Sequence, residues 1–378
     1  MKLTLIAGAR PNFMKIAPII DAIHKAKNEG KEIFYRLVHT GQHFDRNMSN
    51  SFFEQLGIPD PDINLECGGG TQAEQTANIM TKFEKDLMIN PCDLVLVVGD
   101  VTSTLACSIV AKKLHTKVAH VEAGIRSGDL TMPEEINRMV TDSIADYFFT
   151  TSEVANNNLK KAGIPDKRIF FVGNTMIDTL LKHELKFQKP NIWDEIGLRE
   201  KEYFIMTLHR PANVDKQNNL KHLIEKIVLG AKELPVIFPV HPRTAKILNG
   251  IEIKTTNLYV IEPLGYFEFN YLVKYAKAVI TDSGSITEET TVLGIPCFTM
   301  RNNTERPETV YLGTNELIGT NPDNLSPAFD KLFSGKWKKG SIPPLWDGYT
   351  GERIVNHLVN IFNKSEEALF VLEHYTVS

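Results

Sequence analysis

The chain is poor in cysteine and has no long apolar segment. It holds 378 residues, and its scattered cysteines form no Cys-x-x-Cys pair. This scatter excludes a zinc ribbon and a disulfide framework, and it is typical of reduced cysteines in the cytoplasm. No apolar run is long enough to span a membrane, and Arg10 and Pro11 interrupt the N-terminal apolar stretch too early for a signal peptide. We therefore expect a cytoplasmic protein. The four cysteines are Cys67, Cys92, Cys107 and Cys297.

The sequence also lacks an excess of charge of either sign. Lys and Arg total 42, Asp and Glu total 46, and the net charge is −4 at pH 7. Without a basic field, neither a nucleic acid nor a membrane surface is expected as a partner. The sequence has no Gly-x-Gly-x-x-Gly turn and no metal-ligand spacing, so neither a nicotinamide cofactor nor a metal ion is predicted. A small-molecule ligand fits this composition better.

Apolar strands alternate with helical segments along the chain, which predicts α/β domains. A chain of 378 residues exceeds one ordinary core, so we expect two domains of similar size. The unbroken apolar run 94–98 is typical of a central parallel strand buried on both faces. The pattern restarts with a new strand at 203–208. We predict two Rossmann-like doubly wound parallel sheets, in domains of residues 1–173 and 174–360, with an active crevice between them.

A strand, a tight turn and a helix start follow one another in residues 279–289. The turn is Asp282-Ser283-Gly284-Ser285, and helix-forming residues follow it at once. Gly284 lets a ligand approach the backbone, and the first helical amides favour an anion such as phosphate. Glu289, one turn into the helix, would repel phosphate but could accept hydrogen bonds from ribose hydroxyls. This combination predicts a nucleotide site, and the alternative is a surface turn with a capping serine.

Basic side chains follow the first strand of each half. Arg10 lies in a Gly-Ala-Arg-Pro turn and Lys15 about one helical turn further, so both can reach one point beyond the strand. His209 precedes a second Arg-Pro turn at the analogous place in the second half. We expect these three side chains to face an anion. The alternatives are solvated surface charges and, for His209, a structural histidine.

Carboxylates end two strands and begin one helix of the first half. Asp100 follows the strand 94–98, Glu122 closes the strand 118–122, and Glu134 begins a helix. Because ligands in open α/β sheets bind outside the carboxyl ends of strands, we expect the three to converge. The alternatives are a helix N-cap for Asp100 and, for Glu134, an acidic first turn favoured by the helix dipole.

Other candidates lie close to these strand ends. Gln42 and His43 add polar groups after the strand 34–38. Phe269 lies ahead of the predicted nucleotide turn, where it could stack on a base or belong to the core.

Taken together and in order, these motifs resemble those of the UDP-N-acetylglucosamine 2-epimerase family, and the resemblance covers nearly the whole chain. The motifs are Gly8-Ala9-Arg10-Pro11 with Lys15, Val98-Gly99-Asp100 with Thr102 and Thr104, His120-Val121-Glu122-Ala123-Gly124-Ile125-Arg126-Ser127-Gly128, Pro133-Glu134-Glu135-Ile136-Asn137-Arg138, Gly173-Asn174-Thr175, His209-Arg210, Thr281-Asp282-Ser283-Gly284-Ser285 with Glu288-Glu289, and Thr304-Glu305-Arg306-Pro307-Glu308.

The resemblance implies a glycosyltransferase-B-type architecture, a homodimer, and a C-terminal helix, 361–378, that packs back on the first domain. It implies that Asp100, Glu122, Glu134 and His209 are catalytic. It also implies a UDP-sugar site with the uridine diphosphate at the 283–285 turn, the base at Phe269 and the diphosphate near Arg10, Lys15 and His209. The substrate contacts it implies are Arg10, Lys15, Gln42, His43, His209, Phe269, Ser283, Gly284, Ser285, Glu289 and Arg306.

The implied reaction is the non-hydrolysing interconversion of UDP-N-acetylglucosamine and UDP-N-acetylmannosamine, which supplies surface polysaccharide synthesis. It proceeds by elimination of UDP, a 2-acetamidoglucal intermediate and re-addition. Many bacterial members follow Gln-His with a basic, glutamine-rich stretch that binds an activating second substrate, whereas Phe44-Asp45-Arg46-Asn47 follows here. The same segment resembles relatives that act on a diacetamido-glucuronate. The alternatives are therefore 2-epimerisation of such a modified UDP-sugar, a hydrolysing relative that releases N-acetylmannosamine and UDP, a glycosyltransferase, and a sugar-nucleotide sensor.

Overall fold

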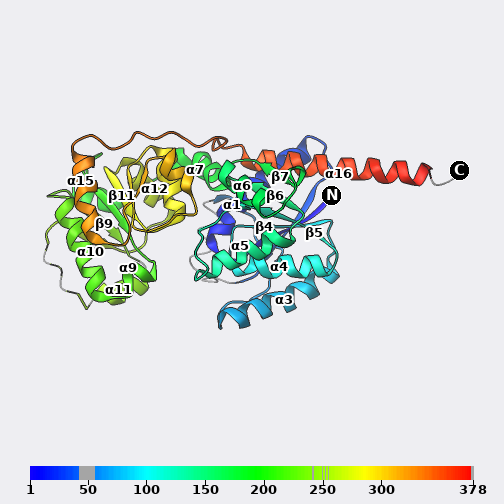
Figure 1. The fold of residues 1–378 in the computed structure, drawn as a ribbon, viewed down its shortest axis with the longest axis horizontal. Coiled ribbons are helices and arrows are strands. Elements are labelled where there is room, and N and C mark those ends of the chain that lie inside the picture. The colour runs from blue at the N-terminus through cyan, green and yellow to red at the C-terminus, as the bar shows by residue number, and fades with distance from the viewer. Residues whose placement is uncertain (42–55, 241, 249, 252, 254, 376–378) are drawn as a thin grey trace. The chain divides into compact units, whose positions relative to one another are not determined.

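The computed structural model describes residues 1–41, 56–240, 242–248, 250, 251, 253 and 255–375. The chain divides into two compact units (Figure 1), of which the first is Met1–Leu181 with Pro344–Ser378 and the second is Lys182–Pro343. Each unit is built on a sheet of its own. None of the described helices is both long enough and apolar enough to cross a membrane.

The sheet of the first unit is parallel in all its described strand pairs, in the order β3-β2-β1-β4-β5-β6-β7. Its strands are β1 Lys2–Ala7, β2 Phe34–His39, β3 Ile63–Asn64, β4 Leu94–Val98, β5 Lys117–Val121, β6 Tyr147–Thr150 and β7 Ile169–Phe171. Its helices are α1 Arg10–Asn28, α3 Gln72–Ile89, α4 Thr102–Lys113, α5 Pro133–Ile144, α6 Glu153–Lys161, α7 Thr175–His183 and α16 Thr350–Tyr375.

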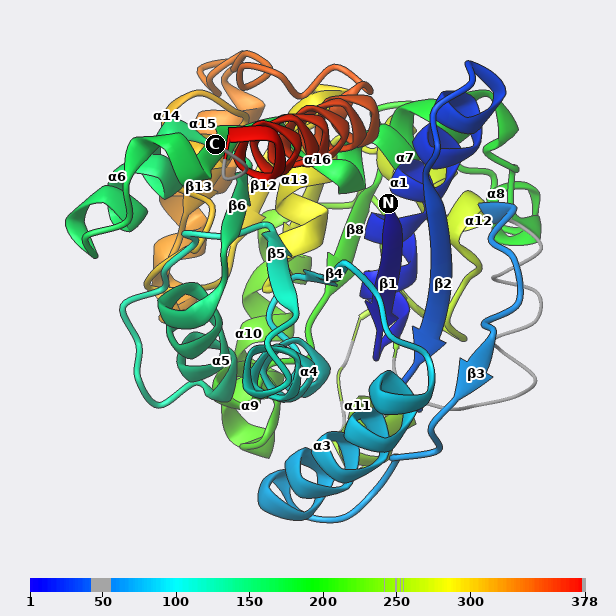
Figure 2. The same ribbon diagram turned by 90° about the vertical axis from the view of Figure 1, so that its right-hand side faces the viewer.

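The apolar sequence of β4 reflects cover on both faces. Every residue of Leu94–Val98 is buried. Val95 and Val97 pack into one cluster with Phe83 of α3 and Cys107 of α4. Figure 2 shows α3, α4 and α5 on one side of these strands and α16 on the other. The prediction of a central strand buried on both faces is confirmed.

The second unit repeats this design with the strand order β10-β9-β8-β11-β12-β13, again parallel in all described pairs. Its strands are β8 Phe204–Thr207, β9 Val236–Pro239, β10 Leu258–Ile261, β11 Ala278–Thr281, β12 Cys297–Thr299 and β13 Asn315–Leu317. Its helices include α8 Asn191–Glu195, α9 Pro211–Val214, α10 Gln217–Gly230, α11 Pro242–Leu248, α12 Tyr266–Tyr275, α13 Gly284–Leu293, α14 Pro307–Tyr311 and α15 Leu325–Phe333.

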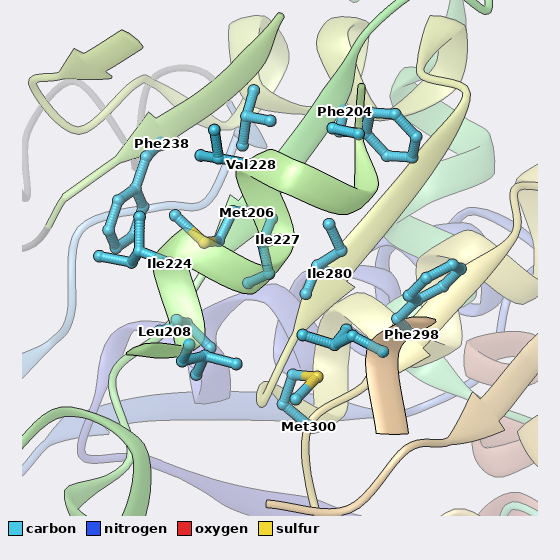
Figure 3. Close-up of a cluster of buried hydrophobic side chains, with 14 of the residues drawn as sticks. Phe204, Met206, Leu208, Ile224, Ile227, Val228, Phe238, Ile280, Phe298 and Met300 are labelled. Carbon is cyan, nitrogen blue, oxygen red and sulfur yellow. The ribbon is translucent and has the colours of Figure 1, made fainter. Parts of the chain in front are cut away.

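Alternate residues of the second sheet enter two separate cores. Phe204 and Met206 of β8 pack with Phe298 of β12 and with apolar residues of α10 (Figure 3). Tyr203 and Ile205, each one residue away, belong to the cluster on the opposite face, against α12. Successive strand side chains point to opposite faces, so both faces need apolar residues. Each fully buried large side chain contributes about 1.5–3 kcal/mol by leaving water.

Both sheets reverse their strand order beside their first strand. β1 lies between β2 and β4, and β8 lies between β9 and β11. In doubly wound sheets, ligands bind outside the carboxyl ends of the strands at such a reversal. The prediction of two doubly wound parallel sheets is confirmed. Asp100 follows β4, His209 follows β8 and Ser283 follows β11, all strands at these reversals.

The unit boundaries differ from the predicted domains 1–173 and 174–360, because the structure places 174–181 and 344–360 in the first unit. The Thr179 hydroxyl of α7 donates to the carbonyl oxygen of Met14 at 2.6 Å. The Asp178 carboxylate accepts the backbone N–H of Gly351, at the start of α16, at 2.8 Å. A Cβ on Gly351 would lie 2.4 Å from the carbonyl oxygen of Pro18. Contacts between residues so distant in sequence cannot be predicted from the order of strands and helices along the chain.

The C-terminal helix begins earlier than the predicted 361–378. α16 starts at Thr350, and its first turns lie against α1, where Lys25 pairs with Glu352 at 2.8 Å. This pair is largely exposed, so it contributes little to stability. The tight contact at Gly351 fixes the helix start more firmly.

Candidate active site

The turn after β1 is fixed to the end of β4 by one asparagine. The Asn12 side-chain oxygen accepts the backbone N–H groups of Gly8 and Ala9 at 3.0 and 2.9 Å. Its amide nitrogen donates to the carbonyl oxygen of Val98 at 3.0 Å. Arg10 begins α1 directly after this turn. The prediction for its side chain, and those for Gln42 and His43, lie outside the part of the chain that the structure describes.

Lys15 and Glu122, two of the predicted site residues, form an ion pair at the strand ends of the first unit. Their side chains are 9% and 6% exposed. Gly99 makes room for this pair, since a Cβ there would lie 3.1 Å from Nζ of Lys15. Withdrawing two charges from water costs several kcal/mol per ion, so such a pair is weak evidence for stability. Its position at a strand end suggests a chemical role instead.

Glu122 has a backbone conformation that is rare outside glycine. Its φ is +71°, which costs about 1–2 kcal/mol for an L-residue. The backbone N–H groups of Glu122 and Ala123 both donate to the carbonyl oxygen of Phe149, at 2.9 and 3.1 Å. These bonds hold the turn, and the unusual backbone directs the Glu122 carboxylate to Lys15. Backbone strain of this kind tends to persist at functional sites.

Asp100 is held by α5. Its carboxylate pairs with Arg138, whose guanidinium also binds Glu135 at 3.0 Å. The Asn137 side chain donates to the carbonyl oxygen of Asp100 at 2.8 Å. The helix-cap alternative for Asp100 does not describe this arrangement, because the carboxylate is engaged by an arginine. Arg138 and Asn137 belonged to a recognised motif, yet the sequence alone gave them no role.

Of the two adjacent acids that start α5, Glu135 is the one that supports the fold. It is buried and accepts the backbone N–H groups of Ser127 and Gly128 at 2.9 and 3.1 Å. Burial by itself raises the pKa of Glu135, but the bonds from Ser127, Gly128 and Arg138 outweigh it and lower the pKa. Glu134 is only half-buried. This difference leaves Glu134 the more accessible acid of the pair.

A buried histidine supports the Gly99-Asp100 turn from below. His120 places Nδ1 2.7 Å from the Asp142 carboxylate and Nε2 2.8 Å from the carbonyl oxygen of Gly99. Asp142 also pairs with Arg126 at 2.6 Å. Burial tends to raise the pKa of Asp142, yet its bonds to His120 and Arg126 lower it. The carboxylate therefore stays charged, and no sequence signal had paired it with His120.

In the second unit, Asp282 joins the turns after β8 and β11. Its carboxylate accepts the backbone N–H of Arg210 at 3.0 Å and the Asn213 side chain at 2.9 Å. It also lies 2.8 Å from Nδ1 of His209. Burial raises the pKa of Asp282, but these partners, His209 first, lower it overall. The predicted His209 is thus attached to the same strand end as the predicted nucleotide turn.

The predicted anion turn has the expected geometry. Ser283 occupies the N-cap of α13 in an extended conformation, and the helix begins at Gly284. Ser283, Gly284 and Ser285 are half-buried, and a Cβ built on Gly284 would meet no atom within 4 Å beyond its chain neighbours and the backbone of its own helix. Open space beside the first helical amides suits an anionic group.

Glu289 lies deeper in α13 and is almost wholly buried. It accepts a hydrogen bond from the Tyr266 hydroxyl at 3.0 Å. Burial raises its pKa to about 7, with the neighbouring Glu288 adding to the effect and bonds from Tyr266 and Asn270 opposing it. Phe269 packs against the core cluster around α12 but is only half-buried, so part of its side chain is exposed.

Arg306 belongs to a group of buried ion pairs in the second unit. Its guanidinium pairs with Glu288. Nearby along the chain, Glu305 pairs with Arg301 at 2.6 Å and with Arg210 at 3.5 Å. These pairs link the loop after β12 to α13 and to the turn after β8. The structure thus places the predicted residues that it describes in two groups, one in each unit.

Comparison with known proteins gives concordant results. A family model described as UDP-N-acetylglucosamine 2-epimerase matches residues 25–359. The chain is 42% identical over 372 residues to the UDP-N-acetylglucosamine 2-epimerase of Methanocaldococcus jannaschii, which covers 95% of this chain and 99% of the relative. It is 41% identical over 329 residues to the UDP-2,3-diacetamido-2,3-dideoxy-D-glucuronate 2-epimerase of Pseudomonas aeruginosa, covering 86% and 90%. The crystal structure of the M. jannaschii enzyme in complex with UDP-GlcNAc and UDP matches with a TM-score of 0.85 at 41% identity, covering 95% of this chain and 100% of that one.

Proposed function

The chain belongs to the UDP-N-acetylglucosamine 2-epimerase family, and we propose that it interconverts UDP-N-acetylglucosamine and UDP-N-acetylmannosamine without hydrolysing them. The observation that carries the proposal is the difference in chemistry between the two groups of residues, one in each unit. Acids at the strand ends of the first unit, Asp100, Glu122 and Glu134, suit proton transfer. The open helix start at 283–285 in the second unit suits a diphosphate.

The substrate dictates an elimination. Carbon 2 of the sugar ring has no adjacent carbonyl, so its proton is not acidic enough to be removed directly. When the bond between carbon 1 and the diphosphate oxygen breaks, the electron pair leaves with UDP and positive charge develops on the ring. A carboxylate then takes the carbon 2 proton, and a double bond forms between carbons 1 and 2. The 2-acetamidoglucal accepts a proton from the opposite face and UDP adds back.

The residues of the first unit fit the proton transfers. Inversion requires removal on one face and return on the other, so more than one acid is needed. Glu122 is paired with Lys15 and Asp100 with Arg138, and these pairs keep both carboxylates oriented. Glu134, half-buried at the start of α5, completes the set.

The residues of the second unit fit the leaving group. The amides at the start of α13, with Ser283, Gly284 and Ser285, would stabilise the departing diphosphate together with Arg10, Lys15 and His209. Glu289 would accept hydrogen bonds from the ribose hydroxyls, and Phe269 would contact the base. Gln42, His43 and Arg306 complete the proposed substrate contacts.

One observation supports an alternative substrate, the diacetamido-glucuronate nucleotide. Identity to the P. aeruginosa enzyme that acts on the diacetamido-glucuronate nucleotide, 41%, is close to the 42% for the M. jannaschii enzyme. The reaction is the same for both substrates, so assays of the two nucleotides in parallel distinguish them by kcat/KM. We further propose a cytoplasmic homodimer that supplies surface polysaccharide synthesis.

Incubation with UDP-N-acetylglucosamine in heavy water tests the reaction. Deuterium should enter carbon 2, and both epimers should be present at equilibrium. Conversion without deuterium incorporation would refute the elimination. Free N-acetylmannosamine appearing as fast as the substrate disappears would instead identify a hydrolysing enzyme.

A further inference from the structure

The Asp282 carboxylate makes more polar contacts than it needs to cap a turn. It has no measurable exposure. Its Oδ2 accepts the backbone N–H of Arg210 at 3.0 Å and the Asn213 side chain at 2.9 Å. The backbone N–H of His209 is 3.2 and 3.1 Å from the two carboxylate oxygens. These bonds fix the backbone of the turn after β8, while Oδ1 remains directed at the His209 ring.

The contact between the carboxylate and the ring determines which nitrogen faces outward. Nδ1 of His209 lies 2.8 Å from Oδ1 of Asp282, and the His209 side chain is 55% exposed. A carboxylate only accepts hydrogen bonds, so the proton of a neutral ring must be on Nδ1. The ring is therefore held at one end by a buried anion, and Nε2 is the end presented to solvent.

We propose that Asp282 is a positioning residue: by accepting Nδ1–H it orients His209 so that Nε2 faces the diphosphate of the nucleotide sugar and donates to it when that nitrogen is also protonated. The inference rests on the proposed function, because it assigns His209 to the leaving group. When the bond at carbon 1 breaks, negative charge grows on the diphosphate oxygen. A ring that donates from both nitrogens carries a positive charge at that point and stabilises the growing charge.

The other charged groups around the turn have partners of their own, so the orientation of the His209 ring depends on Asp282. Arg210 donates from Nε to the carbonyl oxygen of Asp282 at 3.0 Å, and its terminal nitrogen lies 3.5 Å from Glu305. Glu305 is in turn paired with Arg301 at 2.6 Å. Glu305 is thus engaged by arginines, and the carboxylate that contacts the His209 ring is that of Asp282.

The direct test is spectroscopic and uses the whole wild-type protein. The chain has 11 histidines, so 15N-histidine labelling with His209→Ala as the assignment reference isolates the signals of this ring. At alkaline pH, where the ring is neutral, the proton should be on Nδ1, whereas free histidine prefers Nε2. A neutral ring protonated on Nε2 in the wild-type protein overturns the proposal, and His209→Ala is needed only to assign the signals.

A double-mutant cycle separates positioning from general structural support. His209→Ala should lower kcat/KM about 100-fold, the scale of a lost charge-stabilising donor. Asp282→Asn should lower it at least about 10-fold, and the double variant should lose no more than about 3-fold beyond His209→Ala. Losses that multiply in the double variant would mean that Asp282 acts independently of the ring, which contradicts the proposal.

Asn213→Ala is the matched structural control. It removes another donor to Asp282 and the bond from Asn213 to the carbonyl oxygen of Met300 at 3.1 Å, but it retains the carboxylate. It should lower the melting temperature and leave the ring proton on Nδ1. If Asn213→Ala moves the ring proton to Nε2, the rigidity of the turn and not the carboxylate determines the tautomer, and the proposal fails. A wild-type protein that converts no nucleotide sugar would refute the proposed function while the tautomer result stood.

Discussion

The ammonium group of Lys15 is paired with the carboxylate of Glu122, and the two side chains are 9% and 6% exposed. A buried pair of this kind cannot lose one member without leaving the other charge uncompensated. Both residues lie close to strand ends that the sequence pattern predicts, Lys15 in the helix after β1 and Glu122 directly after β5. Their direct pairing means that the charge of the proposed acid and its environment must be tested together.

Glu122→Gln should abolish most turnover while UDP still binds. Glutamine keeps the shape and can still accept a hydrogen bond from Lys15, but it cannot accept a proton from carbon 2. The expected loss in kcat is about 10²- to 10⁴-fold, the range for a general base. Turnover is measured by deuterium incorporation and UDP affinity by calorimetry. Glu352→Gln, which alters an exposed pair with Lys25, is the control and should retain wild-type turnover. Normal turnover of Glu122→Gln would show that another acid removes the proton.

Gly99→Ala should disturb the Lys15 and Glu122 pair through a single added methyl group. The φ of Gly99 is +68°, and the new Cβ would lie 3.1 Å from Nζ of Lys15. Gly30→Ala is the matched control, because Gly30 has a φ of +84° and no atom within 4 Å of the Cβ position. Both variants should lose about 1 kcal/mol of unfolding free energy from the backbone conformation. Turnover should fall only in Gly99→Ala, and equal turnover in the two variants would exclude the proposed effect of the contact.

Asp178 should make the stability of the first unit depend on pH. Burial raises its pKa to about 6, against about 3.9 in an unfolded chain. The folded state then binds the proton more tightly, so this residue's contribution to stability is present at low pH and is lost as pH rises through about 6. Asp178→Asn removes this dependence. Relative to wild type, the variant should gain about 2 kcal/mol of unfolding free energy between pH 4.5 and pH 7.

Urea unfolding of both proteins across that range provides the measurement. The comparison with Asp178→Asn cancels the titration of all other groups that the two proteins share. A difference in unfolding free energy that is constant with pH would show that Asp178 is ionised throughout.

Glu289→Gln should remove a pH dependence from nucleotide binding. The pKa of Glu289 is raised to about 7, chiefly by burial, so the carboxylate that would accept ribose hydroxyls is scarce at pH 6 and abundant at pH 8. The ratio of wild-type to variant UDP affinity should therefore rise about tenfold between these pH values. Using the ratio removes the titration of the ligand itself. A ratio that does not change with pH would contradict the proposed contact with ribose.

The sequence was most informative where local patterns decide the structure. The apolar run of β4 and the alternation of strands and helices predicted both sheets, because a strand buried on two faces has no polar positions. The edge strands β3 and β13, of two and three residues, were missed. Strands so short carry no periodicity, and their pairing partners determine them.

The site was predicted to the level of strand ends but not of partners. Parallel strands bring their carboxyl ends to one edge, so Asp100 and Glu122 could be grouped without a structure. The pairing of His120 with Asp142 and of Asp178 with Gly351 joins residues 22 and 173 positions apart. Such contacts depend on how helices pack on the sheet. The buried arginines show the same limit, because nothing in the sequence distinguishes Arg138 from an exposed residue on the surface of a helix.

The first unit is assembled from both ends of the chain, whereas 182–343 are contiguous. During synthesis on the ribosome, the N-terminal sheet must wait, without the helix that covers α1, until all of the intervening residues have been translated. The second unit is made later, but its residues are consecutive, so it is complete as soon as residue 343 has been translated. Domains generally fold as units as they emerge, so truncations that remove α16 should harm the N-terminal unit and spare the other one.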